Sequence, residues 1–266
     1  MTTLLTIYAF ALGAVIGSFL NVVIYRWPRE ESIVFPPSHC PNCGARIRPW
    51  DNVPIVSWIL LLGRCRSCRQ PISARYPTIE LVNGLFFAAV FLHSGIAIDF
   101  LLLATICSML IVLIYIDLDI QLLPDVVDIP GIGVGLLMGA LGAGRAMPEL
   151  VISDSLLDSV IGAAAGAGII FAVGMAYKLL RGMEGMGLGD VKMLAMIGAV
   201  VGWRAVAPVI FGASFVGAIF GLVIAAKNRQ GLQFALPFGV FLGLSTFATI
   251  FFGHTLLEWY RSLLLG

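Results

Sequence analysis

Long apolar runs recur along most of this chain, and they constrain its fold more than any other feature of the sequence. A helix that crosses a lipid bilayer needs about 20 consecutive, mostly apolar residues. Hydrophobic residues make up 59% of the 266 positions, whereas charged residues make up only 12%. A water-soluble domain of this length needs more charge on its surface. The sequence therefore predicts an all-α, polytopic bundle of membrane helices.

The positions of the apolar runs predict about eight transmembrane helices. They cover residues 4–25, 77–93, 98–116, 129–144, 157–179, 190–203, 206–226 and 234–252. The fourth run is rich in glycine and the sixth is short for a span. The first run lacks the basic flank and the cleavage site of a secretory signal peptide, so we expect it to be retained.

Lysine and arginine are unevenly distributed between the two sides of the predicted bundle. With eight spans and the N-terminus outside, only Arg145, Arg204 and Arg261 of the 16 basic residues lie outside. The positive-inside rule depends on this bias and not on the net charge, which is only +1. We therefore expect the N-terminus outside and the long polar insert in the cytosol.

That insert divides the chain into three predicted parts. Residues 1–26 form the first transmembrane helix, residues 27–76 form the cytosolic insert, and residues 77–266 form a helical membrane core. The insert is too short to bury a large apolar core of its own. It therefore needs a metal ion or disulfides to hold its fold.

Two Cys-x-x-Cys pairs, separated by 21 residues, lie in the insert: Cys40, Cys43, Cys65 and Cys68. Each tight turn offers two thiolates to one ion, and two such pairs at this separation are typical of tetrahedral zinc. Two disulfides are the alternative, but the insert is predicted to be cytosolic, where thiols stay reduced. A closed four-sulfur site has no open position for water. We therefore predict a structural zinc-knuckle insert and not a catalytic metal.

Acidic residues are costly inside or at the edge of membrane spans and often mark function. One concentration of them, which includes Asp117, closes the third predicted span. Another, which ends in Asp190, opens the sixth. Two carboxyl groups that are brought together can share a proton, so that one activates water while the other protonates a scissile carbonyl. This pattern predicts an aspartic-protease pair.

Each acid also has a purely structural interpretation. Asp190 can be a helix N-cap, and Asp117 a surface residue at the end of a span. Asp125 is most simply an N-cap with Asp128 in the first turn, and Asp119 is expected to face solvent or lipid headgroups.

Three glycines favour the catalytic interpretation of the acids. Gly185, Gly187 and Gly189 stand in five residues before Asp190, and they allow an extended substrate to approach the backbone closely. They do not form a dinucleotide-binding loop, because no strand precedes them and a membrane helix follows.

Seven motifs occur in one order along the chain. They lie at residues 17–26, 40–43, 48–54, 65–68, 75–80, 116–125 and 185–192. With this set the chain resembles the type IV prepilin peptidases, GxGD-type membrane aspartic proteases that are leader peptidase and N-methyltransferase in one protein.

The resemblance implies that Asp117 and Asp190 are the catalytic pair, with Gly187 and Gly189 in the signature that Asp190 ends. It implies cleavage of the basic leader of prepilins or pseudopilins at the cytosolic face of the bacterial inner membrane. It also implies methylation of the new N-terminal amine with S-adenosylmethionine, because the cysteine insert marks the bifunctional members. The expected partners are these substrates and membrane lipids, with no nucleic acid.

Two further residues are weaker candidates for supporting the substrate or the methyl donor. Glu80 can neutralise an amine or a sulfonium, or it can be an ordinary first-turn acid that faces Arg75. Asn21 can position substrate or anchor the first span at the headgroups.

Other function classes use some of the same features. An ion- or proton-coupled transporter with a regulatory zinc knuckle would use the two aspartates as ligands or relays, but transporters often carry such charges near mid-membrane. A scaffold or redox sensor would use the cysteines alone and would leave the acids and glycines unexplained.

Overall fold

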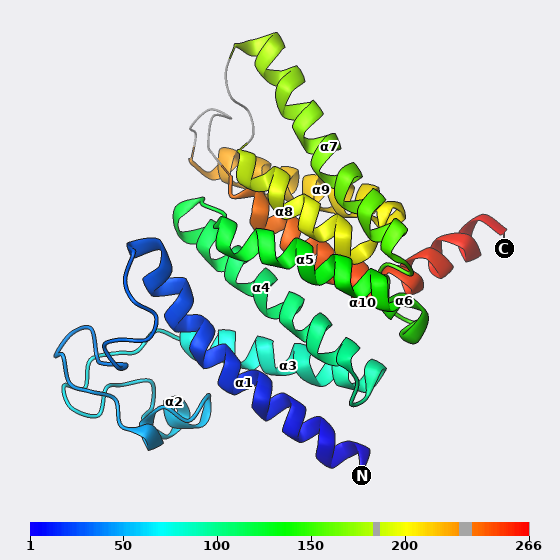
Figure 1. The fold of residues 1–266 in the computed structure, drawn as a ribbon. Helices are drawn as coiled ribbons and strands as arrows, with labels where there is room; N and C mark the ends of the chain where they lie inside the picture. The colour runs from blue at the N-terminus through cyan, green and yellow to red at the C-terminus, as the bar shows by residue number, and fades with distance from the viewer. Residues whose placement is uncertain (183–186, 229–235, 266) are drawn as a thin grey trace. The chain divides into compact units, whose positions relative to one another are not determined.

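The computed structural model describes residues 1–182, 187–228 and 236–265 (Figure 1). Within these ranges the chain forms α-helices and short 3-10 helices, and no β-strand is formed. The predicted all-α class is therefore confirmed. The chain separates into two compact units, Met1–Ile96 and Ala97–Gly266. The three-part division made from the sequence stays a prediction.

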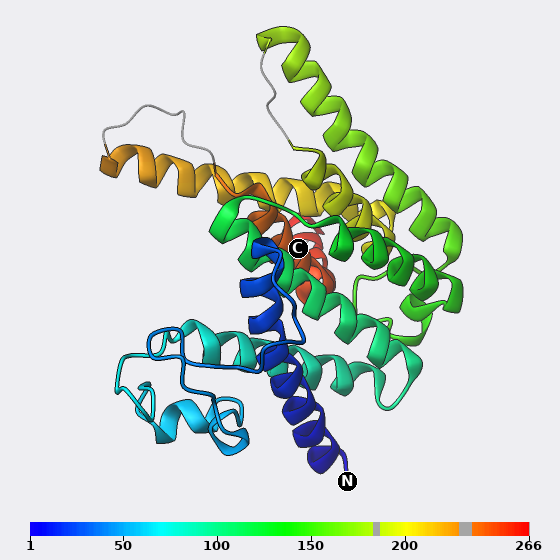
Figure 2. The same ribbon diagram turned by 60° about the vertical axis from the view of Figure 1, so that its left-hand side comes forward.

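The first unit is a pair of helices with the polar insert between them. Helix α1 (Thr2–Arg26) packs along α3 (Arg75–Ser94), as Figures 1 and 2 show. The insert holds the 3-10 helices Trp27–Arg29 and Pro49–Asp51 and the short helix α2 (Val56–Leu60).

Small residues and buried amides hold α1 against α3. A Cβ atom added at Gly17 would lie 2.8 Å from the Cα of Glu80, so the two backbones touch there. The Asn83 side chain donates a hydrogen bond to the carbonyl of Gly13 at 2.6 Å. In a membrane, small residues and interhelical hydrogen bonds of this kind drive helix association.

The second unit is a bundle of seven helices in the described part of the chain. They are α4 (Ile98–Ile120), α5 (Asp125–Leu141), α6 (Ala143–Ala146), α7 (Leu156–Arg181), α8 (Leu188–Val201), α9 (Trp203–Asn228) and α10 (Phe238–Leu265). Helix α8 contacts α5, α7, α9 and α10, and every residue from Met193 to Val201 is buried (Figure 1). The core of this unit therefore surrounds α8.

Glycines set the closest helix contact of this bundle, between α7 and α8. A Cβ atom on Gly162 would overlap the carbonyl oxygen of Gly198, and one on Gly166 would overlap that of Leu194. Such contacts allow two helices to approach to backbone distance. They fix α8 in the bundle and therefore the position of its first turn.

Six helices of the described chain are long and apolar enough to cross a membrane: α1, α3, α4, α7, α9 and α10. The fourth and sixth predicted spans correspond to α5 and α8, which have only 17 and 14 residues. The chain is a multi-pass membrane protein, as the sequence predicted.

Candidate functional site

Asp117 lies in the last turn of α4 and is only 5% exposed. Its carboxylate accepts a hydrogen bond from the backbone N–H of Val240 at 3.0 Å, and a second from the N–H of Gly239. Both amides belong to the first turn of α10, where backbone N–H groups have no partner within the helix. Asp117 therefore caps another helix through its side chain, and this contact fixes the carboxylate in place.

Asp190 lies in the first turn of α8, three residues after the N-cap Gly187. The N–H of Gly187 donates a hydrogen bond to the Asp190 carboxylate. A Cβ atom at Gly189 would lie 2.9 Å from the Cβ of Leu123, so only glycine fits there without displacing the α4–α5 connection. The interpretation of Asp190 as an N-cap is wrong, since Gly187 holds that position. Gly185 lies outside the described residues.

Leu123 lies between the surroundings of the two aspartates. A Cβ atom at Gly239, beside the Asp117 carboxylate, would lie 3.1 Å from Cδ2 of Leu123, and one at Gly189, next to Asp190, would lie 2.9 Å from its Cβ. The two carboxylates therefore lie near enough to interact electrostatically. They come from the C-terminal end of α4 and the N-terminal end of α8, which meet at one end of the second unit. Two carboxyl groups that feel each other's charge do not both ionise freely, and their protonation is a property of the pair. This arrangement is suited to acid–base catalysis.

Three other charged side chains lie around this pair. Lys192 forms an ion pair with Asp125, with its Nζ 2.6 and 2.7 Å from the two carboxylate oxygens. Asp128 is fully buried, and neither of its oxygens has a hydrogen-bond partner in the structure. Asp125 is not the N-cap of α5 but its first residue, because Pro124 occupies the N-cap position. Asp119 is exposed, as expected.

The amide of Gly239 is a part of this site that the sequence analysis did not identify. A Cβ atom at Gly239 would lie 2.9 Å from Oδ2 of Asp117. We therefore expect Gly239→Ala to displace the Asp117 carboxylate from the first turn of α10 and to lower proteolytic activity by at least about tenfold. Gly133→Ala is the matched control, since nothing lies within 4 Å of a Cβ there, and it should retain activity. Equal rates for the two variants, measured as initial cleavage rates, would show that the contact is unimportant.

The second candidate site is the cysteine cluster of the insert. The Sγ atoms of Cys40, Cys43, Cys65 and Cys68 all lie within 4.8 Å of one another, and all four thiols are free. The sulfurs of Cys40 and Cys68 are 3.8 Å apart. Four sulfurs at about 2.3 Å from one zinc ion in a tetrahedron are about 3.8 Å apart, so the cluster fits this metal. Backbone amides of Cys68 and Ser67 lower the pKa of Cys65 to about 7. The backbone amide of Gln70 lowers the pKa of Cys68, but burial and the hydrogen bonds of Cys68 with the other three cysteines outweigh it and raise this pKa to about 11.

The two halves of the cluster have the same backbone hydrogen bonds. In the first, the N–H of Gly44 donates to the carbonyl of Cys40. In the second, the N–H of Arg69 donates to the carbonyl of Cys65. Gly44 and Arg69 have φ angles of 68° and 60°, in the left-handed region. The second knuckle therefore repeats the first, but with an arginine where glycine is favoured.

This difference gives a matched pair of substitutions. Arg69→Gly should stabilise the metal-bound insert by up to about 1 kcal/mol relative to Arg69→Ala, which removes the same charge but keeps the backbone penalty. Gly44→Ala should destabilise it by about 1 kcal/mol through conformation alone, because nothing lies within 4 Å of a Cβ there. The chelator concentration that removes half of the metal measures both effects. No difference between the Gly and Ala variants at position 69 would contradict the assigned backbone conformation.

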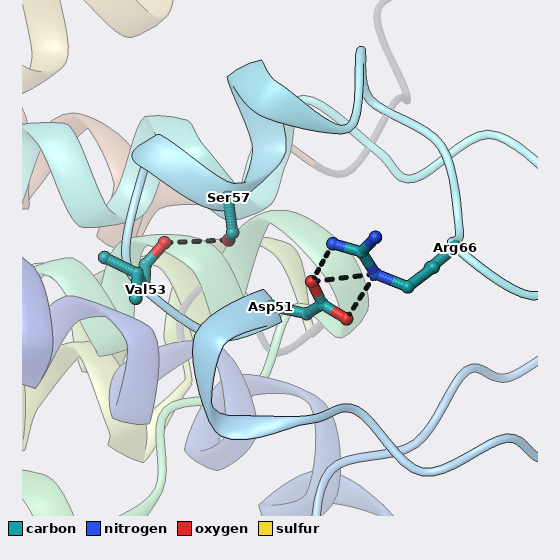
Figure 3. A network of polar contacts seen from close by, with 4 residues as sticks. All are labelled: Asp51, Val53, Ser57 and Arg66. Carbon is teal, nitrogen blue, oxygen red and sulfur yellow. Dashed lines mark hydrogen bonds and ion pairs between the residues drawn. The ribbon is translucent and has the colours of Figure 1, made fainter.

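An exposed ion pair ties the segment between the knuckles to the second knuckle. Figure 3 shows the Asp51 carboxylate facing the Arg66 guanidinium, with Nε and Nη2 of Arg66 at 2.8 and 2.6 Å from its two oxygens. The hydrogen bond from Arg66 lowers the pKa of Asp51. Next to it, the hydroxyl of Ser57 donates to the carbonyl of Val53 and fixes the start of α2.

Glu80 and Asn21 hold the first unit together. Oε2 of the buried Glu80 accepts the N–H of Ile55 at 2.7 Å, and Ser18 also donates to the carboxylate. Ile55 has φ 63° and ψ −54°, and Val56 N–H bonds the carbonyl of Pro54 at 2.5 Å. This is a γ-turn that a β-branched residue adopts only under strain. Glu80 is thus the anchor of the insert.

Asn21 bridges the two helices of that unit. Its amide group donates to the carbonyls of Gly17 in α1 and Tyr76 in α3, each at 3.2 Å. These bonds place Asn21 at the point where α3 leaves the insert. Asn21 therefore supports the helix pair, and its role toward substrate or the headgroups stays a prediction.

Comparisons with known proteins match two family models to this chain, one after the other. The model described as "Bacterial Peptidase A24 N-terminal domain" matches residues 11–94, and the model described as "Type IV leader peptidase family" matches residues 104–222. No solved structure matches the chain.

Several curated relatives carry one name, prepilin leader peptidase/N-methyltransferase. A protein of Burkholderia pseudomallei (strain 1026b) is 39% identical over 92% of this chain and 85% of its own length. Proteins of Aeromonas hydrophila and Pseudomonas putida are 37% and 34% identical, over 94% and 92% of this chain and 92% and 90% of their own lengths. None of these three is named as a transporter. Since both family models match in order and the relatives match over nearly the whole length, the chain belongs to the type IV leader peptidase family.

Proposed function

We propose that this protein removes the leader peptide of type IV prepilins or pseudopilins with Asp117 and Asp190, and then methylates the new N-terminal amine. The names of the relatives support both activities. The observation that carries the peptidase assignment is the meeting of Asp117 and Asp190 at one end of the second unit, within reach of each other's charge.

In the proposed cleavage, the two carboxyl groups share one proton. The ionised member takes a proton from water, and the water oxygen attacks the scissile carbonyl carbon. The protonated member gives its proton to the carbonyl oxygen. When the tetrahedral intermediate collapses, the C–N bond breaks, and the leaving amine takes up the proton that the first carboxylate removed from water. One hydroxyl of the intermediate returns its proton to the second carboxylate, which restores the pair.

The amides that hold the two carboxylates keep this geometry fixed. Those of Gly239 and Val240 hold Asp117, and that of Gly187 holds Asp190. Gly187 and Gly189 leave the backbone before Asp190 without side chains. We propose that an extended substrate segment lies against this stretch, which water reaches at the membrane edge.

The second activity needs a methyl donor. S-adenosylmethionine would supply a methyl group bound to a positively charged sulfur. A neutral amine would attack the methyl carbon, the carbon–sulfur bond would break, the neutral thioether would leave, and the methylated amine would release a proton to water. In this proposal Glu80 and Asn21 affect methylation indirectly. Their polar atoms form hydrogen bonds with the backbone of the first unit and hold the insert in place. The four cysteines hold a structural zinc ion that gives the insert its fold.

We propose that the N-terminus is outside and that the insert and the aspartates face the cytosol of a bacterial inner membrane. Asp117 and Asp190 meet at one end of the bundle, so an even number of crossings must separate them. Since α7 is long enough to cross, α5 must cross too. Val240 also reaches Asp117, so α8 must cross together with α9. This reasoning supports eight spans.

Mass spectrometry of a prepilin peptide incubated with the purified protein tests both activities. We expect loss of the leader, followed by a shift of one methyl group only when S-adenosylmethionine is added. A peptide that is already cut should be methylated without cleavage. If the peptide stays intact at every enzyme concentration, the peptidase assignment is wrong. If the cut peptide is never methylated, only the second activity is lost from the proposal.

A further inference from the structure

An open recess of about 570 Å³ lies in the second unit at the end of α8 opposite to Asp190. It is formed where α8 ends and α7 and α9 begin, beside α6 and α10. Its apolar wall includes Leu150, Val151 and Ile152. Its polar side chains are those of Arg145, Arg204, His254, Asp154 and Asp158. None of these residues has a place in the proposed chemistry.

The ends of three candidate spans border the recess. Candidate spans begin at Leu156 in α7 and at Trp203 in α9, and a third ends at Leu256 in α10. Trp203 is 48% exposed, and the guanidinium of Arg204 lies 5.3 Å from its ring centroid. Tryptophan and arginine together are typical of the boundary between hydrocarbon and headgroups.

Positive charge in the recess is available to a ligand. Neither Arg145 nor Arg204 forms an ion pair with another residue in the described ranges. The N-terminal ends of α7 and α9 also border the recess, but the Asp158 carboxylate already lies against both of them, at Asp154 and at Gly202. The two guanidinium groups are therefore the part of the recess that suits a phosphate group.

Of the two acidic side chains in the recess, Asp158 is hydrogen-bonded to the protein, whereas Asp154 is exposed. The carboxylate of Asp158 accepts the N–H of Asp154 at 3.3 Å, while the Asp158 N–H donates to Ser155, and the carboxylate also packs against Gly202. Asp158 is thus part of the cap of α7. The exposed Asp154 side chain remains as a negative group beside the arginines.

We propose that this recess binds the headgroup of a zwitterionic phospholipid, with the phosphate on Arg145 and Arg204 and a primary ammonium on Asp154. The apolar wall of residues 150–152 receives the start of an acyl chain. A phosphoethanolamine headgroup carries a phosphate for the arginines and an ammonium for Asp154, whereas a phosphatidylglycerol headgroup carries no ammonium. The site holds a structural lipid between the ends of α7, α9 and α10.

Native mass spectrometry of the purified full chain tests this binding directly. The protein is delipidated in detergent and titrated separately with phosphatidylethanolamine, with phosphatidylglycerol of the same acyl chains, and with inorganic phosphate. We expect one saturable phosphatidylethanolamine adduct and a rise in Tm, with weaker effects of the other two. The double variant Arg145→Gln/Arg204→Gln should lose at least about tenfold in affinity. Arg181→Gln, at the other end of α7, is the matched control and should bind as the wild type does.

Asp154→Asn separates a zwitterionic site from a general anion site. Loss of the carboxylate should weaken phosphatidylethanolamine binding and leave phosphatidylglycerol binding unchanged or stronger. Unchanged adducts in the double arginine variant, equal binding of both lipids by the wild type, or full stabilisation by inorganic phosphate alone would each overturn the proposal. All three substitutions are at exposed positions, and far-ultraviolet circular dichroism checks that the variants fold.

Discussion

Asp117→Asn and Asp190→Asn should each reduce leader cleavage by about 10²–10⁴-fold or more. Asparagine keeps the shape of the side chain and can still accept the N–H groups that hold each residue, but it cannot exchange a proton with water or substrate. The initial rate of leader removal from a prepilin peptide, followed by mass, measures the loss. Both variants should keep the thermal stability of the wild type and should still methylate a peptide that is already cut.

Asp119→Asn is the control for this experiment. Asp119 is exposed near the end of the same helix, two residues from Asp117, so its substitution changes the local charge equally but should leave the rate within about twofold. If Asp117→Asn retains substantial cleavage while Asp190→Asn loses it, Asp117 is passive, and the proposed pair is wrong.

Removal of the metal from the insert is expected to unfold it. Structural zinc contributes about 10–16 kcal/mol of apparent binding free energy in small domains, more than an insert without a large core can replace. Treatment with a strong chelator, or the substitutions Cys40→Ser and Cys68→Ser, should release one zinc ion per chain. The insert should then be cut by a protease between residues 30 and 73, while the second unit remains intact.

Cys107→Ala is the matched control for the cysteine variants. Cys107 is fully buried in α4, in the other unit of the chain, and should have no effect on zinc content. Elemental analysis of the purified proteins gives the stoichiometry. If Cys40→Ser keeps one zinc ion, or if the wild type contains no metal and its insert resists the chelator but not a thiol reductant, the cluster is not a zinc site.

The features that the sequence predicts well depend on composition or on short spacings. Apolar runs indicate membrane helices because the bilayer selects for them, and two Cys-x-x-Cys turns need only fold toward each other to bring four sulfurs together. The structural similarity of the two knuckles is harder to predict from the sequence. They share their hydrogen bonds and a left-handed residue, but Gly44 and Arg69 have nothing in common as side chains.

The features that the sequence does not predict are contacts made by backbone atoms of distant segments. Any residue can offer the amide that Gly239 and Val240 give to Asp117, so only the three-dimensional structure identifies them. Proline at 237 followed by glycine at 239, just before an apolar run, is the one local signal of a helix start there.

The sequence also does not predict the surroundings of two acidic side chains, Glu80 and Asp128. The sequence leaves Glu80 open between a charge partner for an amine or sulfonium and a first-turn acid, and neither alternative names the strained amide of Ile55, 25 residues earlier in the chain. Asp128 does lie in the first turn of α5, as the sequence predicts, but the sequence does not reveal that it is completely buried without a hydrogen bond. Burial of a charged side chain is decided by the helices packed against it, which local sequence does not encode.

The shortness of α8 has a consequence for the depth of its first turn in the membrane. Fourteen residues of α-helix are about 21 Å long, well below the roughly 30 Å of a typical hydrocarbon layer. The neighbouring helices enclose α8 from Met193 to Val201, so protein and not lipid surrounds this short span. A depression between those longer helices would then bring water down to Asp190. A prepilin would meet the enzyme at the floor of that depression.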